Sequence, residues 1–184
     1  KYIDGIPRYD GVRNFLASRG ITLAEGTPED EPGKETVIGL GNQKNVYFQE
    51  MVRDGGVEVY PDTVAFLKSV RHQGYHTAVI SASKNCQAIL AAAGLEYLFE
   101  TRVDGVVAAQ LGLKGKPEPD IFIEAARRLH VLPQQAAIFE DALAGVQAGK
   151  AGNFAVVVGI DRTNEADQLK QLGANVVLQR FPTL

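Results

Sequence analysis

Three short segments of the chain carry residue types that could bind a phosphoryl group and a metal ion. Ser81 is a hydroxyl residue between the apolar run 77–80 and a predicted helix, whose amides could hold an anion such as phosphate. Lys116 lies between a glycine and a proline, so its ammonium is held in place. Glu140 and Asp141 end an apolar run, and paired carboxylates there could form half of a Mg²⁺ site.

Each segment also has a purely structural interpretation. Ser81 and Ser83 could be turn and helix-cap residues, which is the favoured interpretation of that segment taken alone. Lys116 could be an exposed loop lysine, and Glu140 and Asp141 could cap a helix. The order of hydroxyl, lysine and acid pair is far more specific than any one of the three.

These segments follow strands of a predicted α/β core. After Tyr60 the chain alternates between short apolar runs and helical patterns, which predicts a parallel sheet covered by helices on both faces. Ligands bind at the carboxyl ends of strands in such a core. Strands are predicted at 77–80, 136–139, 154–158 and 176–178, and helices at 61–74, 83–94, 120–129, 142–151 and 164–172.

The first sixty residues have a helical pattern with no convincing strand. Asp10 is predicted to cap a helix that ends at Gly20. Residues 25–34 are rich in acids, prolines and glycine and are predicted to form an exposed loop, followed by a second helix over 43–53. This pattern predicts a small helical unit ahead of the core.

Composition excludes several classes of protein. Of 184 residues, 45% are apolar and 22% charged, which is ordinary for a globular protein and argues against disorder. The net charge of −3 argues against a nucleic-acid binder, and no apolar run is long enough to cross a bilayer. Cys86 is the only cysteine, predicted to be a small buried residue, and no signal peptide is visible, so a cytoplasmic protein is expected.

The three strand-end segments resemble the haloacid dehalogenase (HAD) superfamily, and most closely its β-phosphoglucomutase-like branch. Ser81 matches the hydroxyl of the second motif, Lys116 in Gly-Lys-Pro-Glu-Pro-Asp the lysine of the third, and Glu140-Asp141 the metal-binding acids of the fourth. The string Ser-Ala-Ser-Lys-Asn is a close match to the version of the second motif that binds phosphate. Its members are Ser81, Ala82, Ser83, Lys84 and Asn85.

The resemblance extends to the helical unit, which corresponds to the cap of these enzymes. Asp4-Gly5-Ile6-Pro7-Arg8 is similar to the start of the cap, where an arginine binds the remote phosphate of the substrate. The string 41–45 is similar to a second cap segment, in which Lys44 would face the substrate. Arg8 and Lys44 could equally be solvated surface cations, the commoner position of long basic side chains.

The resemblance implies an HAD-like Rossmannoid core at 61–184 with a helical cap at 1–60. The first motif of the family, Asp-x-Asp on a central strand, does not occur in the written chain, and Asp4 and Asp10 fall in cap-like segments. We therefore expect the natural protein to be longer at its amino end. We also expect the chain as written to lack the nucleophile, and so to be inactive by itself.

The function implied by the resemblance is Mg²⁺-dependent phosphoryl transfer on a sugar phosphate through an aspartyl-phosphate. A β-phosphoglucomutase that interconverts β-glucose 1-phosphate and glucose 6-phosphate is the leading hypothesis. The alternatives are a sugar-phosphate phosphatase, including one for trehalose-phosphate-type substrates, and a non-catalytic relative. A small-molecule substrate is expected, with no nucleic-acid or membrane partner, and a monomer is favoured.

Overall fold

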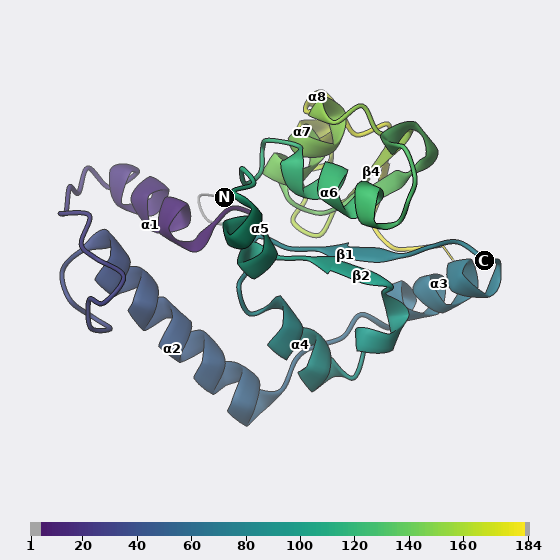
Figure 1. Ribbon diagram of the computed structural model, residues 1–184. Coiled ribbons are helices and arrows are strands. Elements are labelled where there is room, and N and C mark those ends of the chain that lie inside the picture. The colour runs from purple at the N-terminus through teal and green to yellow at the C-terminus, as the bar shows by residue number, and fades with distance from the viewer. Residues whose placement is uncertain (1–4, 183–184) are drawn as a thin grey trace.

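The computed structural model describes residues 5–182 and has a helical part and an α/β part (Figure 1). Asp4, which the sequence comparison placed at the start of the cap, lies outside these residues. Two helices, α1 (Arg8–Ala17) and α2 (Val37–Gly55), pack against each other away from the strands. We call this pair of helices the cap.

Both cap helices begin earlier than the sequence pattern predicts. Helix α1 starts at Arg8, so Asp10 lies inside its first turn and does not cap it. Helix α2 starts after Thr36, whose hydroxyl accepts the backbone N–H of Gly39 at 2.9 Å. This cap bond satisfies an amide that has no partner within the helix, and it extends α2 well before residue 43.

The loop before α2 is not fully exposed as predicted, because the carboxylate of Asp30 is buried in it. Asp30 accepts hydrogen bonds from the Thr36 hydroxyl at 2.7 Å and the Lys34 ammonium at 2.6 Å. These contacts lower the pKa of Asp30 to about 2, with Lys34 the larger cause and Thr36 the second. A buried carboxylate thus organises a segment whose composition is typical of an exposed loop.

The strands of the core are parallel, as the alternating pattern predicts, but they form two sheets and not the single sheet expected. Strands β1 (Ala78–Ile80) and β2 (Thr101–Val103) form the first sheet. The second has the order β3-β4-β5, with β4 in the middle. Its strands are β3 (Ala137–Glu140), β4 (Val156–Ile160) and β5 (Val176–Leu178).

Helices cover both sheets. The core helices are α3 (Pro61–His72), α4 (Cys86–Ala93), α5 (Gly105–Leu111), α6 (Asp120–Arg128), α7 (Leu143–Ala151) and α8 (Ala166–Gln171). Two short 3₁₀ turns, Glu96–Leu98 and Pro133–Gln135, join them to the strands. Cys86 is buried as predicted, at 4% exposure.

Helix α6 joins the two sheets. It contacts β1 and β2, and its Phe122 packs with Ile138 of β3 and Ala148 of α7, with Ile80 of β1 against the same cluster. Helix α3 contributes Phe66, whose ring lies 5.1 Å from that of Phe139 in β3. Within residues 5–182, β1 pairs only with β2, and β3 pairs only with β4. Each sheet therefore has an open edge, formed by β1 in one sheet and by β3 in the other.

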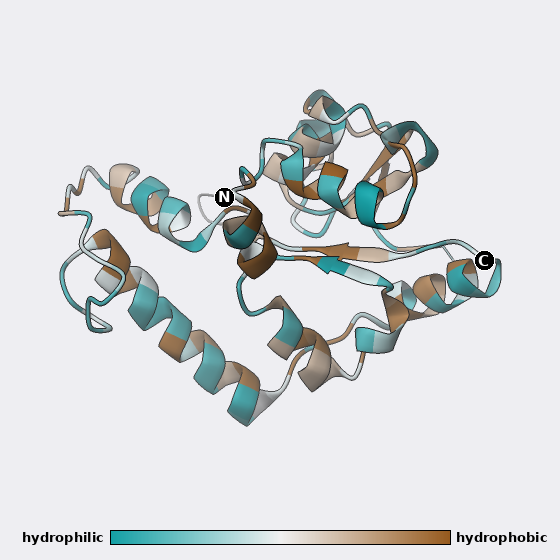
Figure 2. Ribbon diagram, viewed as in Figure 1, coloured by the Kyte–Doolittle hydropathy of each residue, from teal (hydrophilic) through white to brown (hydrophobic). Residues whose placement is uncertain are grey.

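Strand β2 and helix α5 were not predicted. The strand is only three residues long and has Arg102 at its centre, so it shows no apolar run. Helix α5 begins with glycine and two valines, which are weak helix formers. It is strongly hydrophobic (Figure 2), and Val107 and Ala108 pack against the core cluster around Val103 and Ile121.

Candidate functional site

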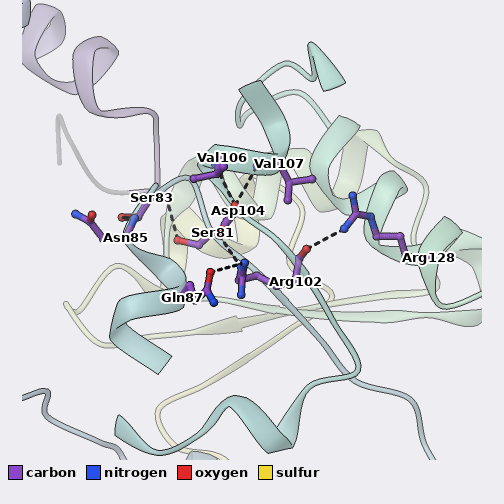
Figure 3. Close-up of polar contacts among 9 residues, drawn as sticks. All are labelled: Ser81, Ser83, Asn85, Gln87, Arg102, Asp104, Val106, Val107 and Arg128. Atoms are coloured by element: carbon purple, nitrogen blue, oxygen red, sulfur yellow. Dashed lines mark hydrogen bonds and ion pairs between the residues drawn. The ribbon is translucent and has the colours of Figure 1, made fainter. Parts of the chain in front are cut away.

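The loop after β1 forms a tight turn held by its own hydroxyl groups. Ser81 Oγ accepts the backbone N–H of Ser83, and Ser83 Oγ accepts that of Asn85, both at 3.1 Å. Figure 3 shows these residues together at the start of α4. The structural interpretation of Ser81 and Ser83 as turn residues therefore holds. Ser83 does not cap α4, which begins at Cys86.

Strand β2 is followed by Asp104, which caps α5 and fixes it beside this turn. Its Oδ1 accepts the backbone N–H groups of Val106 and Val107, and the guanidinium of Arg102 donates to its Oδ2 at 2.7 Å (Figure 3). Gly105 begins α5 so close to the turn that a Cβ there would lie 2.6 Å from the Ala82 carbonyl oxygen. The first residue of α5 must therefore be very small.

Lys116 is buried, which excludes the interpretation of it as an exposed loop residue. Its ammonium donates to Oε1 of Glu140, and both side chains are less than 10% exposed. It also lies 5.1 Å from the ring centroid of Phe122. Burial lowers the pKa of Lys116 to about 8, and the nearby carboxylate of Asp141 opposes that shift.

Glu140 is held on both carboxylate oxygens. Lys116 donates to Oε1, and the backbone N–H groups of Asp141 and Ala142 donate to Oε2 at 3.0 and 3.1 Å. Gly145 of α7 lies against the same carboxylate, and a Cβ there would collide with it. Glu140 thus connects the loop that carries Lys116 to the turn after β3.

The acid pair fits a Mg²⁺ ion in part. Asp141 is exposed at the end of β3, and Mg²⁺ is commonly held by one or two carboxylates plus water and phosphate oxygens. Glu140 would have to share with the metal an oxygen that now accepts from Lys116 or from the turn amides. No cluster of three metal-binding side chains occurs among residues 5–182, so these residues supply at most part of a metal site.

A pocket of about 490 Å³ lies between the cap and the carboxyl ends of β1 and β2. Volumes of 300–1,000 Å³ are typical of small-molecule sites. The pocket brings together most of the residues selected from the sequence: Arg8, Lys44, Ser81, Ala82, Ser83, Lys84 and Asn85. Lys116 and the acid pair lie outside this lining, although the neighbouring Gly115 belongs to it.

Close backbone contacts place the start of the cap over the core loops. A Cβ on Gly5, which has a φ of +73°, would lie 2.6 Å from the Ala142 side chain, and one on Gly115 would lie 2.7 Å from the Pro7 ring. The segment before α1 therefore passes directly over the loops that carry Lys116 and Asp141.

Asn45 of α2, which the sequence reasoning did not select, joins the cap to the core. Its Oδ1 accepts the Arg8 guanidinium and the Asn85 side-chain amide, both at 2.7 Å. Tyr9 and Phe48 also line the pocket and were not selected. An asparagine within a helical pattern gives no signal of such a contact, so only the structure reveals it.

No helix among residues 5–182 is both long and apolar enough to traverse a bilayer.

The family model described as "haloacid dehalogenase-like hydrolase" matches residues 6–153. A protein named beta-phosphoglucomutase from Mycobacterium bovis is 49% identical over 180 residues, covering 96% of this chain and 69% of its own length. A trehalose-phosphate phosphatase from Mycobacterium leprae is 32% identical over 120 residues, covering 63% of this chain and 26% of its own.

Solved structures show the same fold. The crystal structure of a β-phosphoglucomutase from Clostridium difficile matches with a TM-score of 0.77 and 25% identity. The match covers 99% of this chain and 74% of that one. The HAD-like fold predicted from the strand-end motifs is therefore confirmed.

Proposed function

Because the chain belongs to the haloacid dehalogenase-like hydrolase family, we propose that it acts in Mg²⁺-dependent β-phosphoglucomutase chemistry. The reaction is the interconversion of β-glucose 1-phosphate and glucose 6-phosphate. One observation carries the proposal: the pocket is lined by basic or amide side chains from both the cap and the core. The cap contributes Arg8 and Lys44, and the core contributes Lys84 and Asn85.

Donors on two facing units suit a ligand with anionic groups on both sides. Arg8 and Lys44 would bind the phosphate that does not react, while Ser81 and nearby backbone amides would bind oxygens of the phosphoryl group in transfer. Cap residues that touch the substrate also shield the reaction from water, which favours transfer between sugar oxygens over hydrolysis.

Lys116 would neutralise charge on the transferring phosphoryl group. Its burial supports this role, since an ammonium shielded from water attracts an anion more strongly than an exposed one. Glu140 would hold the ammonium in place. A Mg²⁺ ion bound by Asp141, with Glu140 beside it, would reduce the repulsion between the phosphate and its attacking carboxylate.

The nucleophile is proposed to be an aspartate of an Asp-x-Asp strand between β1 and β3. The open edges of these strands support this placement, because each can form one further ladder of hydrogen bonds. Helix α6 contacts β1 and β3 on the two sides of this position, and helix α3 contacts β3. The 184-residue chain by itself is accordingly proposed to turn over no phosphate ester.

The test compares this chain with an extended chain, in which an Asp-x-Asp strand from a β-phosphoglucomutase precedes residue 1. Both are incubated with β-glucose 1-phosphate, Mg²⁺ and a trace of glucose 1,6-bisphosphate. We expect glucose 6-phosphate from the extended chain only. Turnover by the 184-residue chain would overturn the placement of the nucleophile, and no turnover by either chain would count against the mutase.

A sugar-phosphate phosphatase is the second candidate, favoured by the similarity to the trehalose-phosphate phosphatase of M. leprae. The same assay separates the two, because a phosphatase releases inorganic phosphate in proportion to substrate consumed. If the extended chain yields free glucose and phosphate without glucose 6-phosphate, the mutase proposal is wrong. If it binds a sugar phosphate and Mg²⁺ without any turnover, a non-catalytic relative is the better description.

A further inference from the structure

We infer that Asn45 is a positioning residue, which assembles a two-donor phosphate subsite from one cap residue and one core residue. The inference rests on the proposed sugar-phosphate function and adds a residue to it. The donors are the guanidinium of Arg8 and the side-chain amide of Asn85, and the side-chain oxygen of Asn45 accepts from both.

The geometry brings two residues from distant parts of the sequence together. Arg8 Nη2 and Asn85 Nδ2 each lie 2.7 Å from the same oxygen, so they are no further apart than twice that distance. Arg8 begins α1 of the cap, and Asn85 precedes α4 of the core. Two donors this close can both reach the oxygens of one phosphate group.

The side-chain oxygen of Asn45 competes only weakly with a phosphate ligand for these two donors. An amide oxygen is neutral, whereas a phosphate oxygen is charged and accepts a stronger hydrogen bond from a guanidinium. The donors would therefore turn to an incoming phosphate at little cost. All three side chains are half-buried and line the pocket, so water competes less for their hydrogen bonds than it would at an exposed site.

Preorganisation is the physical benefit. A free arginine side chain samples many rotamers, and part of that freedom is lost when it binds a ligand. Asn45 restricts Arg8 before the ligand arrives, and it ties the cap to the core across the pocket. The contact thus serves affinity for the phosphate and the placement of the cap together.

The test measures the dissociation constant of glucose 6-phosphate by calorimetry, using the 184-residue chain. Asn45→Ala removes the shared acceptor, and we expect affinity to fall about tenfold. Asn45→Gln keeps the amide group and introduces a good helix former, so this variant should fold. Because its oxygen is displaced by one methylene, we expect a loss of affinity for glucose 6-phosphate nearly as large as that in Asn45→Ala.

Asn42→Ala is the matched control. Asn42 lies on the same helix, accepts the Tyr9 hydroxyl at 2.9 Å and donates to the Asp30 carbonyl oxygen, so it also ties cap elements together without reaching the core. Its loss should loosen the cap and leave the affinity within twofold. A second readout is the Arg8→Ala background, in which Asn45→Ala should have less than half its effect, because one of its two donors is already gone.

The outcomes separate the two proposals. If the wild-type chain binds glucose 6-phosphate and both Asn45 variants bind it equally well, the inference is wrong and the sugar-phosphate proposal stands. An equal loss in Asn42→Ala would also overturn the inference, because general loosening of the cap would then be sufficient. If the wild-type chain binds no glucose 6-phosphate, both the inference and the sugar-phosphate site are rejected.

Discussion

The ammonium of Lys116 forms a buried ion pair with the carboxylate of Glu140. Lys116 lies in the loop after α5, and Glu140 is the last residue of β3, next to the loop that follows it. Glu140 also accepts two backbone N–H groups of its own turn, so the pair joins both loops into one rigid unit. Breaking it should affect the stability of the fold as well as the site.

Glu140→Gln should therefore destabilise the chain by about 3–5 kcal/mol, the cost of leaving one member of a buried ion pair without its counterion. Urea unfolding of the 184-residue chain measures this change. Asp141→Asn is the control, since Asp141 is exposed and its substitution should change stability by less than about 0.5 kcal/mol. Equal effects of the two substitutions would contradict a special role for the buried pair.

Asp141→Asn should instead weaken metal binding. In the extended chain, we expect the Mg²⁺ concentration for half-maximal activity to rise at least tenfold, because a proposed ligand is lost. Titration of activity with Mg²⁺ measures this change, with Asp161→Asn as a control in another strand-end loop. Asp161 already accepts the N–H of Glu165 at 2.8 Å, so its substitution should leave the Mg²⁺ requirement unchanged.

Gly145→Ala should disrupt the Lys116–Glu140 ion pair without replacing either charged residue. A methyl group there would occupy the position of the Glu140 carboxylate and push it from Lys116. Alanine is the better helix former by about 1 kcal/mol, so a net loss of stability would show that the steric effect dominates. Gln147→Ala, at an exposed site in the same helix, is the control and should be neutral or mildly stabilising. A Gly145→Ala chain as stable as wild type would refute this account.

The cap should lose stability in acid through Asp30. Its pKa is about 2 in the folded chain against an ordinary value of 3.8, so the unfolded chain binds more protons between these values. The contribution of the carboxylate is complete above about pH 4 and is lost as the pH falls toward 2.

Comparison with Asp30→Asn isolates that contribution from those of other carboxylates. The difference in unfolding free energy between the two chains should shrink as the pH falls from 5 to 2. A difference that stays constant over this range would mean that Asp30 does not titrate in the way its contacts with Lys34 and Thr36 imply.

The sequence was most informative where strands end. Ser81 and the acid pair follow apolar runs, and the structure places both at strand ends because parallel strands bring their carboxyl ends to one edge. It was least informative about contacts between distant segments. The burial of Lys116 depends on Phe122 and Glu140, and the hydrogen bonds of Asn45 depend on contact between the cap and the core. Neither arrangement produces a recognisable pattern in the local sequence.

Arg8 and Lys44 are both predicted to bind phosphate, but they should respond differently to exchange of one cation for the other. Arg8 is half-buried and already uses one guanidinium nitrogen for Asn45, so a ligand must use another in a fixed direction. Lysine cannot supply two donors in the planar arrangement of a guanidinium. Arg8→Lys should therefore raise the dissociation constant of glucose 6-phosphate nearly as much as Arg8→Ala, by about tenfold or more.

Lys44 is exposed and lines the same pocket, so its ammonium acts as a mobile charge. Lys44→Arg should preserve the affinity within about twofold, while Lys44→Ala should weaken it by less than Arg8→Ala does, since an exposed cation is screened by water and salt. Raising the salt concentration should accordingly reduce the effect of Lys44→Ala more than that of Arg8→Ala. If Arg8→Lys binds glucose 6-phosphate as well as wild type does, the positive charge alone accounts for the contribution of Arg8 to binding. Its hydrogen bond to Asn45 then has no part in binding.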